Sequence, residues 1–485
     1  MIKHRSFTQG IHPGWLVFVL SLGLWTGNAP SAFAQCETRK LLANDGESGD
    51  LFGNSLSIDG DLLVISAAGG NGGRGAVYVY RRDPVSSTWV HEAKLVASDS
   101  FGAGFGQSVS VSGNVIVVGA PLDFALGPTS GSAYVFRYDP VNSKWTPETK
   151  LLAFDYYGSA SNDRFGQSVS LSGNVLAVGA WLSTNEAGDY TGAANVFRYD
   201  GSSWVQETRL FPPDDGNGDW FGENLSLCDD VLLIGAAGHS AFGQRVGAAY
   251  VYRHDTESLT WILEAKLMAS DGADLDYFGF RLDLHDDVAL IGSPFKDDPG
   301  ENSGSAYVFR FDEITSTWLE EAKLLPSDGA TRDVFATDLV LRDDVAYVCT
   351  LNGDGIFSDS GSVYRFRFDG ANWTEEIELF PSYDGDHFGS SIVERAGEIL
   401  VGALADDDQG RSSGSVFVFA TDNETCCPTD TDASGEVNVF DLLDLLQAWG
   451  SCPAPCPPDT NRDGRVNVED LLRLLSTWGE CPSII

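Results

Sequence analysis

The clearest chemical pattern in the sequence is a twelve-residue stretch that occurs twice near the C-terminal end. Each copy places side chains with oxygen donors at positions 1, 3, 5, 9 and 12, and glycine at position 6. Calcium takes about six to eight oxygen ligands; position 7 adds a main-chain carbonyl, and the glycine permits the sharp turn on which the ligands converge. Two aligned copies argue against simple acidic turns. The sequence therefore predicts two calcium ions, one bound by Asp430, Asp432, Ser434, Glu436, Asn438 and Asp441 and the other by Asp459, Asn461, Asp463, Arg465, Asn467 and Asp470.

Each stretch leads directly into an apolar run with helical spacing, over residues 442–449 and 471–478, and no helix precedes either one. This order of loop, helix, linker, loop and helix resembles a type I dockerin, built on EF-hand-like calcium loops. The resemblance covers residues 427–481, within a module that we place at residues 425–485. It implies calcium-dependent folding and docking to a cohesin-like module of another protein. By the same resemblance, the partner contacts fall on Val439, Phe440, Val468 and Glu469, which differ from the Ser-Thr pairs common in cellulosomal dockerins.

The elements before this module repeat seven times. Each repeat has a Phe-Gly pair, an alternating strand, a tight turn, a second apolar strand and a third strand that begins after glycine. The pairs begin at Phe52, Phe105, Phe165, Phe221, Phe278 and Phe388, with a degenerate copy at Phe335-Ala336. A fourth strand opens on tryptophan only six times, at Trp89, Trp145, Trp204, Trp261, Trp318 and Trp373. Four-stranded units arranged radially form a β-propeller, so the segment 38–43 is predicted to supply the missing strand and close the ring.

Residues 38–420 resemble FG-GAP repeats, the family of the integrin α-subunit propeller. Many blades of that family carry a calcium loop between the first two strands. Here this connection is only two residues, such as Asp59-Gly60 or Gly173-Asn174, which is too short to surround the ion. The predicted fold is thus an all-β seven-bladed propeller over residues 35–424, without calcium in its blades, followed by a small α-helical module with two calcium loop-helix units.

Alternate turns of such a propeller lie on opposite faces. The long connections, between strands two and three and between consecutive blades, share one face, which we call the long-loop face; variable loops on a rigid scaffold are common binding sites. Its aromatic residues are Phe124, Tyr156, Tyr157, Trp181, Tyr190, Trp220, Phe242, Phe295 and Tyr383. Its acidic residues are Asp155, Asp189, Asp214, Asp215, Asp219, Asp276, Asp297, Asp298, Asp384 and Asp386. Two interpretations stay open: a site for a sugar or a protein, or rim packing beside a solvated acidic face, and charge runs favour the second.

Five of the eight cysteines fall between residues 426 and 481, and the secretory route predicted in the next paragraph allows them to form disulfides. Two symmetric pairings are possible in the module. We favour Cys427–Cys481 with Cys452–Cys456, since the start of one repeat lies near the end of the other in antiparallel duplications. Cys36 and Cys426 flank the two ends that meet in the closing blade and could join there. We expect Cys228 and Cys349 to be free thiols.

Residues 1–34 have a basic start, an apolar run and the cleavage motif Ala32-Phe33-Ala34, which together predict a secretory signal peptide. The chain has 485 residues and a formal charge of −40, which excludes most nucleic-acid binding and disfavours anionic lipid. No segment after the signal is predicted to enter a membrane. No catalytic constellation is recognisable, so we predict a secreted, non-catalytic binding or adhesion protein. The alternatives are a polysaccharide-active glycosidase or lyase and a purely structural extracellular scaffold.

Overall fold

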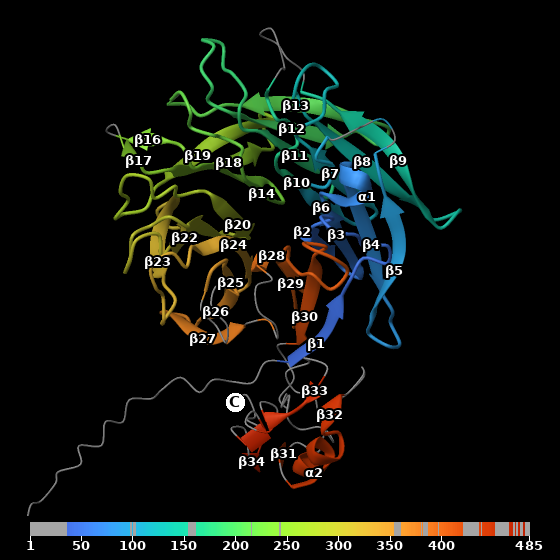
Figure 1. Cartoon of the computed structure of the whole chain (residues 1–485). Coiled ribbons are helices and arrows are strands. Elements are labelled where there is room, and N and C mark those ends of the chain that lie inside the picture. Colours follow the sequence, from blue (N-terminus) through green and yellow to red (C-terminus); the bar gives the residue numbers. More distant parts are fainter. Residues whose placement is uncertain are drawn as a thin grey trace, which may run out of the picture. The chain divides into compact units, whose positions relative to one another are not determined.

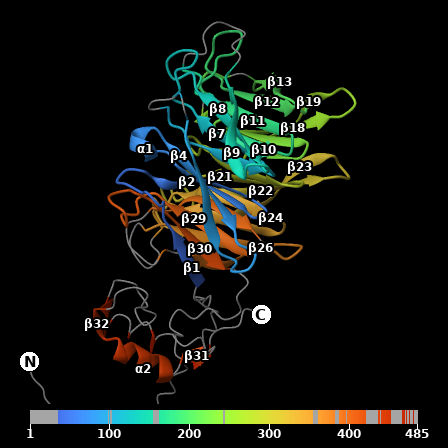
Figure 2. The ribbon, with the colours of Figure 1, turned by 90° about the vertical axis from the view of Figure 1, so that its right-hand side faces the viewer.

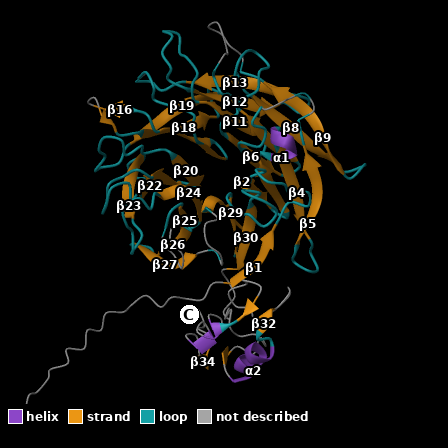
Figure 3. Ribbon diagram, in the orientation of Figure 1, coloured by secondary structure: helices purple, strands orange, loops and turns teal. Residues whose placement is uncertain are grey.

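The computed structural model describes residues 36–97, 99, 103–153, 162–214, 216–241, 244–353, 360–379, 381, 387–395, 397–420, 436–437, 439–451, 465–468, 471, 474–475 and 479–480. Within these residues, seven four-stranded antiparallel sheets are arranged as the blades of a propeller, and their innermost strands surround a central channel (Figure 1). Strands dominate and the connections between them are loops (Figure 3). The predicted all-β seven-bladed propeller is confirmed.

We number the blades along the chain and give their strands from the channel outward. Blade 1 has β2 (Phe52–Asp59), β3 (Leu62–Ala67), β4 (Ala76–Arg82) and β5 (Trp89–Leu95); blade 2 has β6 (Val109–Ser112), β7 (Val115–Ala120), β8 (Ser132–Asp139) and β9 (Lys144–Leu151). Blade 3 has β10 (Val169–Ser172), β11 (Val175–Ala180), β12 (Ala193–Tyr199) and β13 (Trp204–Leu210); blade 4 has β14 (Leu225–Cys228), β15 (Val231–Ala236), β18 (Ala248–Asp255) and β19 (Thr260–Leu267). Blade 5 has β20 (Arg281–His285), β21 (Val288–Ser293), β22 (Ser305–Asp312) and β23 (Thr317–Leu324); blade 6 has β24 (Phe335–Arg342), β25 (Val345–Thr350), β26 (Ser362–Phe368) and β27 (Trp373–Leu379). Blade 7 has β28 (Phe388–Arg395), β29 (Glu398–Ala403), β30 (Ser415–Ala420) and β1 (Cys36–Leu41). The loops add the short turn α1 (Gly70–Gly73) and the hairpin of β16 (Ser240–Ala241) with β17 (Gln244–Arg245).

The ring closes through the two ends of the propeller segment, as the strand count predicted. β1 pairs antiparallel with β30, with Cys36 opposite Ala420 and Leu41 opposite Val416. Ser48 Oγ also donates a hydrogen bond to the Arg411 carbonyl, 2.9 Å away and 363 positions along the chain. Blade 7 therefore has its fourth strand, and its third strand, β30, is paired on both sides like the third strands of the other six blades.

The hydrophobic core lies between neighbouring blades rather than inside one sheet. The second strands of blades 1 to 5 are buried along their whole length, and those of blades 6 and 7 are buried after their first residue, because each is covered by a blade on both sides. The phenylalanine of each Phe-Gly pair is fully buried in such an interface, for example Phe165 among residues of blades 2 and 3. Gly166 has a φ of +90°, and a Cβ there would lie 2.2 Å from the Ser132 carbonyl oxygen of blade 2. Glycine is needed for this close approach.

Three of the repeated tryptophans, Trp145, Trp318 and Trp373, donate a hydrogen bond to a glutamate of the preceding blade. Trp145 is buried, and its Nε1 donates a hydrogen bond to Glu92 of the preceding blade at 2.8 Å. Glu92 also pairs with Arg81, whose guanidinium lies over the Tyr138 ring of blade 2. Blades 4 and 5 repeat the arrangement with Glu264 and Trp318, at 2.9 Å.

The described C-terminal residues contain one helix, α2 (Val439–Gln447), and two short strand pairs. β31 (Glu436–Val437) pairs with β34 (Gly479–Glu480), and β32 (Gly450–Ser451) pairs with β33 (Arg465–Val466). Leu445, Val466 and Leu474 form a small buried cluster. The start of each repeat thus pairs with the end of the other, as expected for an antiparallel duplication. Figure 2 gives the second view of the ribbon, turned by 90°.

Candidate ligand-binding channel and rim

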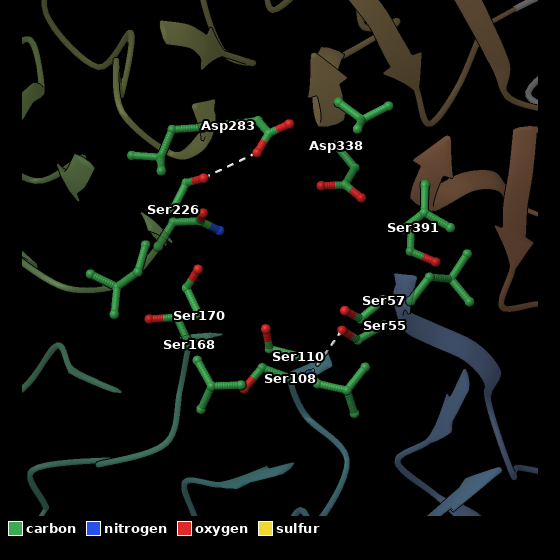
Figure 4. Close-up of a pocket in the computed structure, with 18 of the residues that line it drawn as sticks. Ser55, Ser57, Ser108, Ser110, Ser168, Ser170, Ser226, Asp283, Asp338 and Ser391 are labelled. Atoms are coloured by element: carbon green, nitrogen blue, oxygen red, sulfur yellow. Dashed lines mark hydrogen bonds between the residues drawn. The ribbon is translucent and has the colours of Figure 1, made fainter. Parts of the chain in front are cut away.

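A channel runs between the innermost strands of all seven blades and encloses a cavity of about 720 Å³. Serine dominates the blades 1–3 side, while Asp283 and Asp338 face it from blades 5 and 6 (Figure 4). Because side chains alternate along a strand, each innermost strand points its polar residues at the channel and its apolar residues at the core, as Val109 and Val111 do.

The serine hydroxyls complete the edges of the innermost strands. The outer N–H groups of an edge strand have no partner in their own sheet. Here these N–H groups donate to serine hydroxyls of the preceding blade, with N···Oγ distances of 2.9–3.3 Å. The pairs, acceptor first, are Ser55 with Val109, Ser57 with Val111, Ser110 with Leu171, Ser112 with Gly173, Ser170 with Leu227, Ser172 with Asp229 and Ser226 with Leu284. The carboxylates of Asp283 and Asp338 likewise accept the main-chain N–H groups of Leu341 and Ile392, at 2.9 Å each. These contacts hold neighbouring blades together around the channel.

Blades 4 to 6 depart from the serine pattern and carry charged side chains. Arg342 Nη1 lies 3.1 Å from an Asp283 oxygen, and Arg281 Nε lies 3.8 Å from Asp338. Asp338 is deeply packed although 24% of its side chain faces the channel, and burial raises its pKa to about 6 against the field of Arg281. Burial also raises the pKa of Glu223 to about 7, again opposed by Arg281. The pKa of both carboxyl groups is therefore raised, and of the two only Glu223, with a pKa of about 7, is protonated to a large extent at neutral pH.

The described acidic residues of the long-loop face are of two kinds: Asp189, Asp214 and Asp297 are exposed, whereas others are buried and paired. Asp219 and Asp276 are buried: Asp219 lies 3.2 Å from His239 Nδ1, and Asp276 lies 2.9 Å from Lys296. A second arrangement also pairs carboxylates on this face: tyrosine and lysine from the third and fourth strands of a blade bind a loop aspartate. It recurs as Tyr78, Lys94 and Asp45; Tyr134, Lys150 and Asp99; Tyr250, Lys266 and Asp214; and Tyr307, Lys323 and Asp271.

Asp271 shows the electrostatics of this cluster. Partial burial acts to raise its pKa, but hydrogen bonds from Lys323 and Tyr307, each 2.7 Å long, outweigh that effect and hold the pKa below its usual value. Asp298 pairs with Lys323 at 2.5 Å as well, whereas Asp297 accepts the main-chain N–H of Asn302. The described carboxylates of these clusters are thus structural. Asp155, Asp215, Asp384 and Asp386 lie outside the described residues.

Five aromatic residues form one continuous row across blades 3 to 5. Trp181 meets Trp220 edge to face with ring centroids 5.8 Å apart, and Trp220 stacks on Tyr277 with 4° between planes. Tyr277 meets Phe295 at 5.5 Å, and Phe295 meets Phe280 at 6.0 Å. We call these five residues the aromatic row. Phe295 is its most exposed member, at 36%.

Two further predicted aromatics are exposed outside this row. Phe124, in the β7–β8 connection of blade 2, is 61% exposed. Tyr190 is 52% exposed and lies beside the loop that carries Trp220, because its carbonyl accepts the Gly218 N–H at 2.8 Å. Tyr156, Tyr157, Phe242 and Tyr383 lie outside the described residues. Sequence reasoning missed Tyr277, Phe280, Glu223, Arg281 and Asp338, which alignment of the seven repeats would have singled out.

The opposite face has the predicted two-residue turns. In blade 1 the turn is Gly60-Asp61, one residue later than the pattern suggested, since Asp59 pairs with Leu62. Among the described residues, no group of three or more His, Cys, Asp or Glu side chains could hold a metal ion. No helix in this part of the chain is long and apolar enough to cross a membrane.

Most of the predicted calcium ligands lie outside the described residues: Asp430, Asp432, Ser434, Asn438, Asp459, Asn461, Asp463 and Asp470. Glu436 and Arg465, at position 7 of each stretch, lie in the short strands β31 and β33. Asp441 and Phe440 are described only through the backbone of α2, and the Asn467 carbonyl accepts the Leu471 N–H at 3.2 Å. Val439 and Val468, two predicted partner contacts, are exposed; Glu469 is not described. Both calcium sites stay predictions.

The cysteine predictions are tested only in part. Cys228 and Cys349 are free, as expected, and Cys349 is buried. Cys36 stands opposite Ala420 in the closing blade, but Cys426, Cys427, Cys452, Cys456 and Cys481 lie outside the described residues. The preferred pairings Cys427–Cys481 and Cys452–Cys456 stay predictions.

Comparison with known families agrees with this geometry. The FG-GAP repeat family matches residues 36–80, 89–136, 145–197, 204–252, 261–309, 318–366 and 373–419. The matches cover more than half of the chain, so the protein belongs to the FG-GAP repeat family. Each match begins in the last strand of one blade and ends in the third strand of the next, which reproduces the displaced strand that closes the ring. No curated protein matches the chain significantly.

Proposed function

We propose that this protein is a secreted, non-catalytic binding or adhesion protein whose propeller binds a protein or carbohydrate ligand on its long-loop face. The aromatic row is the observation that carries this proposal. Partly exposed aromatic side chains are enriched at binding surfaces because they supply large contact areas at low entropic cost. The row lies on the face with the long loops, whereas described turns of the opposite face such as Gly60-Asp61 are only two residues long.

The test is a comparison of purified full-length variants on arrays of immobilised polysaccharides and extracellular proteins. Tyr190→Ala and Phe295→Ala remove exposed aromatics at the row, while Phe124→Ala removes a more exposed aromatic from the same face in blade 2. Loss of the same ligand in the first two variants, with retention in the third, would support the proposal. If the wild-type protein retains none of these molecules, the structural-scaffold alternative is favoured.

A polysaccharide-active enzyme is the second candidate, because Glu223 and Asp338 in the channel have pKa values near those suited to proton transfer. Polysaccharide cleavage by the wild-type protein that is abolished in Glu223→Gln and Asp338→Asn would favour the enzyme. Binding without cleavage in the wild-type protein would refute it.

For the C-terminal module we propose calcium-dependent docking to a cohesin-like partner. The two twelve-residue stretches carry the oxygen donors that calcium prefers. In addition, Val439, Leu443 and Leu446 on α2 are exposed, and Val468 and Leu475 of the second copy are exposed too. Exposed apolar side chains in both copies are suited to an interface.

Calcium titration of the full chain by calorimetry tests this part of the proposal. We expect two ions for the wild-type protein and none for the double variant Asp430→Ala, Asp459→Ala, while Asp61→Ala in a propeller turn should keep both. Binding of a purified cohesin module should disappear with chelator. Equal binding with calcium and with chelator would sink the docking proposal.

A further inference from the structure

The seven repeats provide an internal reference that locates one exceptional sector. The residue before each conserved phenylalanine has a positive φ, between 49° and 65°, in all seven blades. These residues are Leu51, Gly104, Arg164, Trp220, Tyr277, Val334 and His387. Only blades 4 and 5 place a tryptophan or tyrosine ring there. The shared backbone conformation means that the difference lies in the side chains and not in the path of the chain.

A second repeat position departs in the same two blades. Two residues after the conserved phenylalanine, the other blades carry uncharged polar side chains: Asn54, Gln107, Gln167, Thr337 and Ser390. Blade 4 has Glu223 instead, and blade 5 has Phe280. Glu223 lines the channel, and its N–H donates to the Trp220 carbonyl at 3.1 Å. Glu223 therefore connects the backbone at Trp220, a member of the aromatic row, with the lining of the channel.

The aromatic side chains of blades 4 and 5 are held in place by their neighbours. Trp220 rests on Gly238, where a Cβ would lie 3.0 Å from the indole ring, and Tyr277 covers its other side. The ring contacts on Phe295 come from Tyr277 and Phe280, which leaves part of its surface exposed. Oε2 of Glu223 is buried and has no hydrogen-bond partner among the described residues. Aromatic surface with a few convergent polar groups is typical of ligand sites.

The charges around the row select against ionic ligands. Arg245 lies over Trp220 at 5.9 Å and Arg281 over Phe280 at 4.7 Å, so a cationic group would meet positive charge where it would otherwise bind an aromatic face. The formal charge of the whole chain is −40, which repels polyanions. With cations and polyanions disfavoured, the site is best suited to an uncharged ligand. A sugar ring is uncharged and combines an apolar face with hydroxyl groups.

We propose that a neutral saccharide binds at the channel mouth of blades 4 and 5, with its apolar face on Phe295 and Tyr277 and its hydroxyl groups directed to Glu223. This inference rests on the proposed binding function and adds the class of ligand and the place where it binds. The hydroxyl groups of a saccharide can donate to and accept from a carboxyl group.

Binding at this place should depend on pH through Glu223. A ligand that covers the carboxyl group removes more water from it, which disfavours the ionised form further. Among the described residues, Arg281 on β20 is the charged group whose field acts on Glu223, and it opposes burial only in part. Binding therefore takes up a proton, and affinity falls as the pH rises through about 7.

The experiment is calorimetric titration of the full-length protein with neutral cello-, xylo-, manno- and N-acetylchito-oligosaccharides at pH 5.5 and 8.5. We expect at least one series to bind, with weaker binding at pH 8.5. Phe295→Ala should weaken binding by about tenfold, which corresponds to about 1.4 kcal/mol, and Phe124→Ala should leave it unchanged. Glu223→Gln, which stays uncharged, should bind equally at both pH values.

Several outcomes would overturn the inference. They are binding of none of the four series, equal loss in Phe295→Ala and Phe124→Ala, or an unchanged pH profile in Glu223→Gln. Phe295→Tyr keeps an aromatic ring at this position and serves as the control for misfolding of Phe295→Ala. It should retain the binding that Phe295→Ala loses. If Phe295→Ala instead abolishes binding of a protein ligand from the array, the proposed function stands and the saccharide inference fails.

Discussion

Replacement of Lys40 by methionine should loosen the strand that closes the ring. The Lys40 amine pairs with Asp406, which is 1% exposed, and lies 2.8 Å from Asp408. Burial acts to lower its pKa, but the hydrogen bonds to Asp406 and Asp408 outweigh burial and raise it. Lys40→Met keeps the apolar stem and removes the charge, which leaves Asp406 buried with only the Ser415 hydroxyl, at 2.7 Å, as a side-chain donor.

Blade 1 provides a matched control. Lys94 occupies the same position of its strand: Lys40 stands opposite Phe417 and Lys94 opposite Tyr78, each amine 4.9 Å from that ring. Lys94 forms an ion pair with Asp45, which is 58% exposed. Removing one partner of a buried pair costs about 3–5 kcal/mol, and we take about 3 kcal/mol for Lys40 because Ser415 remains. Exposed pairs contribute about 0.2–1 kcal/mol, so Lys94→Met should cost less than about 1 kcal/mol.

Amide hydrogen exchange read by mass spectrometry measures the opening of each blade separately. In Lys40→Met, exchange from β30 should accelerate by about 100-fold, since every 1.4 kcal/mol is a factor of ten. In Lys94→Met, exchange from β4 should accelerate by less than about fivefold. Equal acceleration in the two variants would refute the argument that burial of the partner decides the cost. Unchanged exchange from β30 would refute the role of this ion pair in closure.

Three further substitutions test the interior of the ring. Urea unfolding should show that Glu223→Gln is more stable than the wild-type protein by about 1–3 kcal/mol at pH 8 and equally stable at pH 4. The reason is that folding raises the pKa of Glu223 from 4.5 to about 7. The stabilising contribution of the protonated side chain is therefore complete below pH 4.5 and is lost as the pH rises through 7. Phe165→Ala should cost about 3–5 kcal/mol by opening a cavity between blades 2 and 3, and a loss below 1 kcal/mol in the same assay would contradict the interblade core. Ser57→Ala should cost about 1–2 kcal/mol, because the Val111 N–H loses its acceptor, whereas Ser86→Ala in an exposed turn should be neutral.

The ring and its closure could be predicted because both depend on counting. Seven sets of three strands and six tryptophan strands leave one place empty, and only the segment at 38–43 could fill it; β1 covers Cys36–Leu41 and pairs as expected. The burial of Phe165 and the need for Gly166 follow from the repeat in the same way. Ala336 adopts a φ of 71°, so even the degenerate copy keeps the backbone.

The fate of the loop side chains could not be predicted, because it depends on which loops meet. Asp276 looked like part of a solvated run, yet Lys296 reaches it from a neighbouring loop. The serines of the innermost strands gave no sign that each accepts an N–H from the next blade. The ring contacts of Tyr277 and Phe280 could not be predicted either, because their partners Trp220 and Phe295 come from other connections.

Closure between β1 and β30 also fixes an order of events during synthesis. The ribosome makes the chain from its N-terminus, so Cys36–Leu41 is among the first parts of the propeller to emerge, and its partner Ser415–Ala420 is the last strand. Contacts between segments so far apart in the sequence form slowly, because bringing the segments together costs conformational entropy before any favourable contact is made. Until β1 pairs with β30, blade 7 has only three strands, and both β30 and β1 lack their partner. A chain interrupted anywhere before residue 415 cannot close, and its exposed edge strand is a template for aggregation.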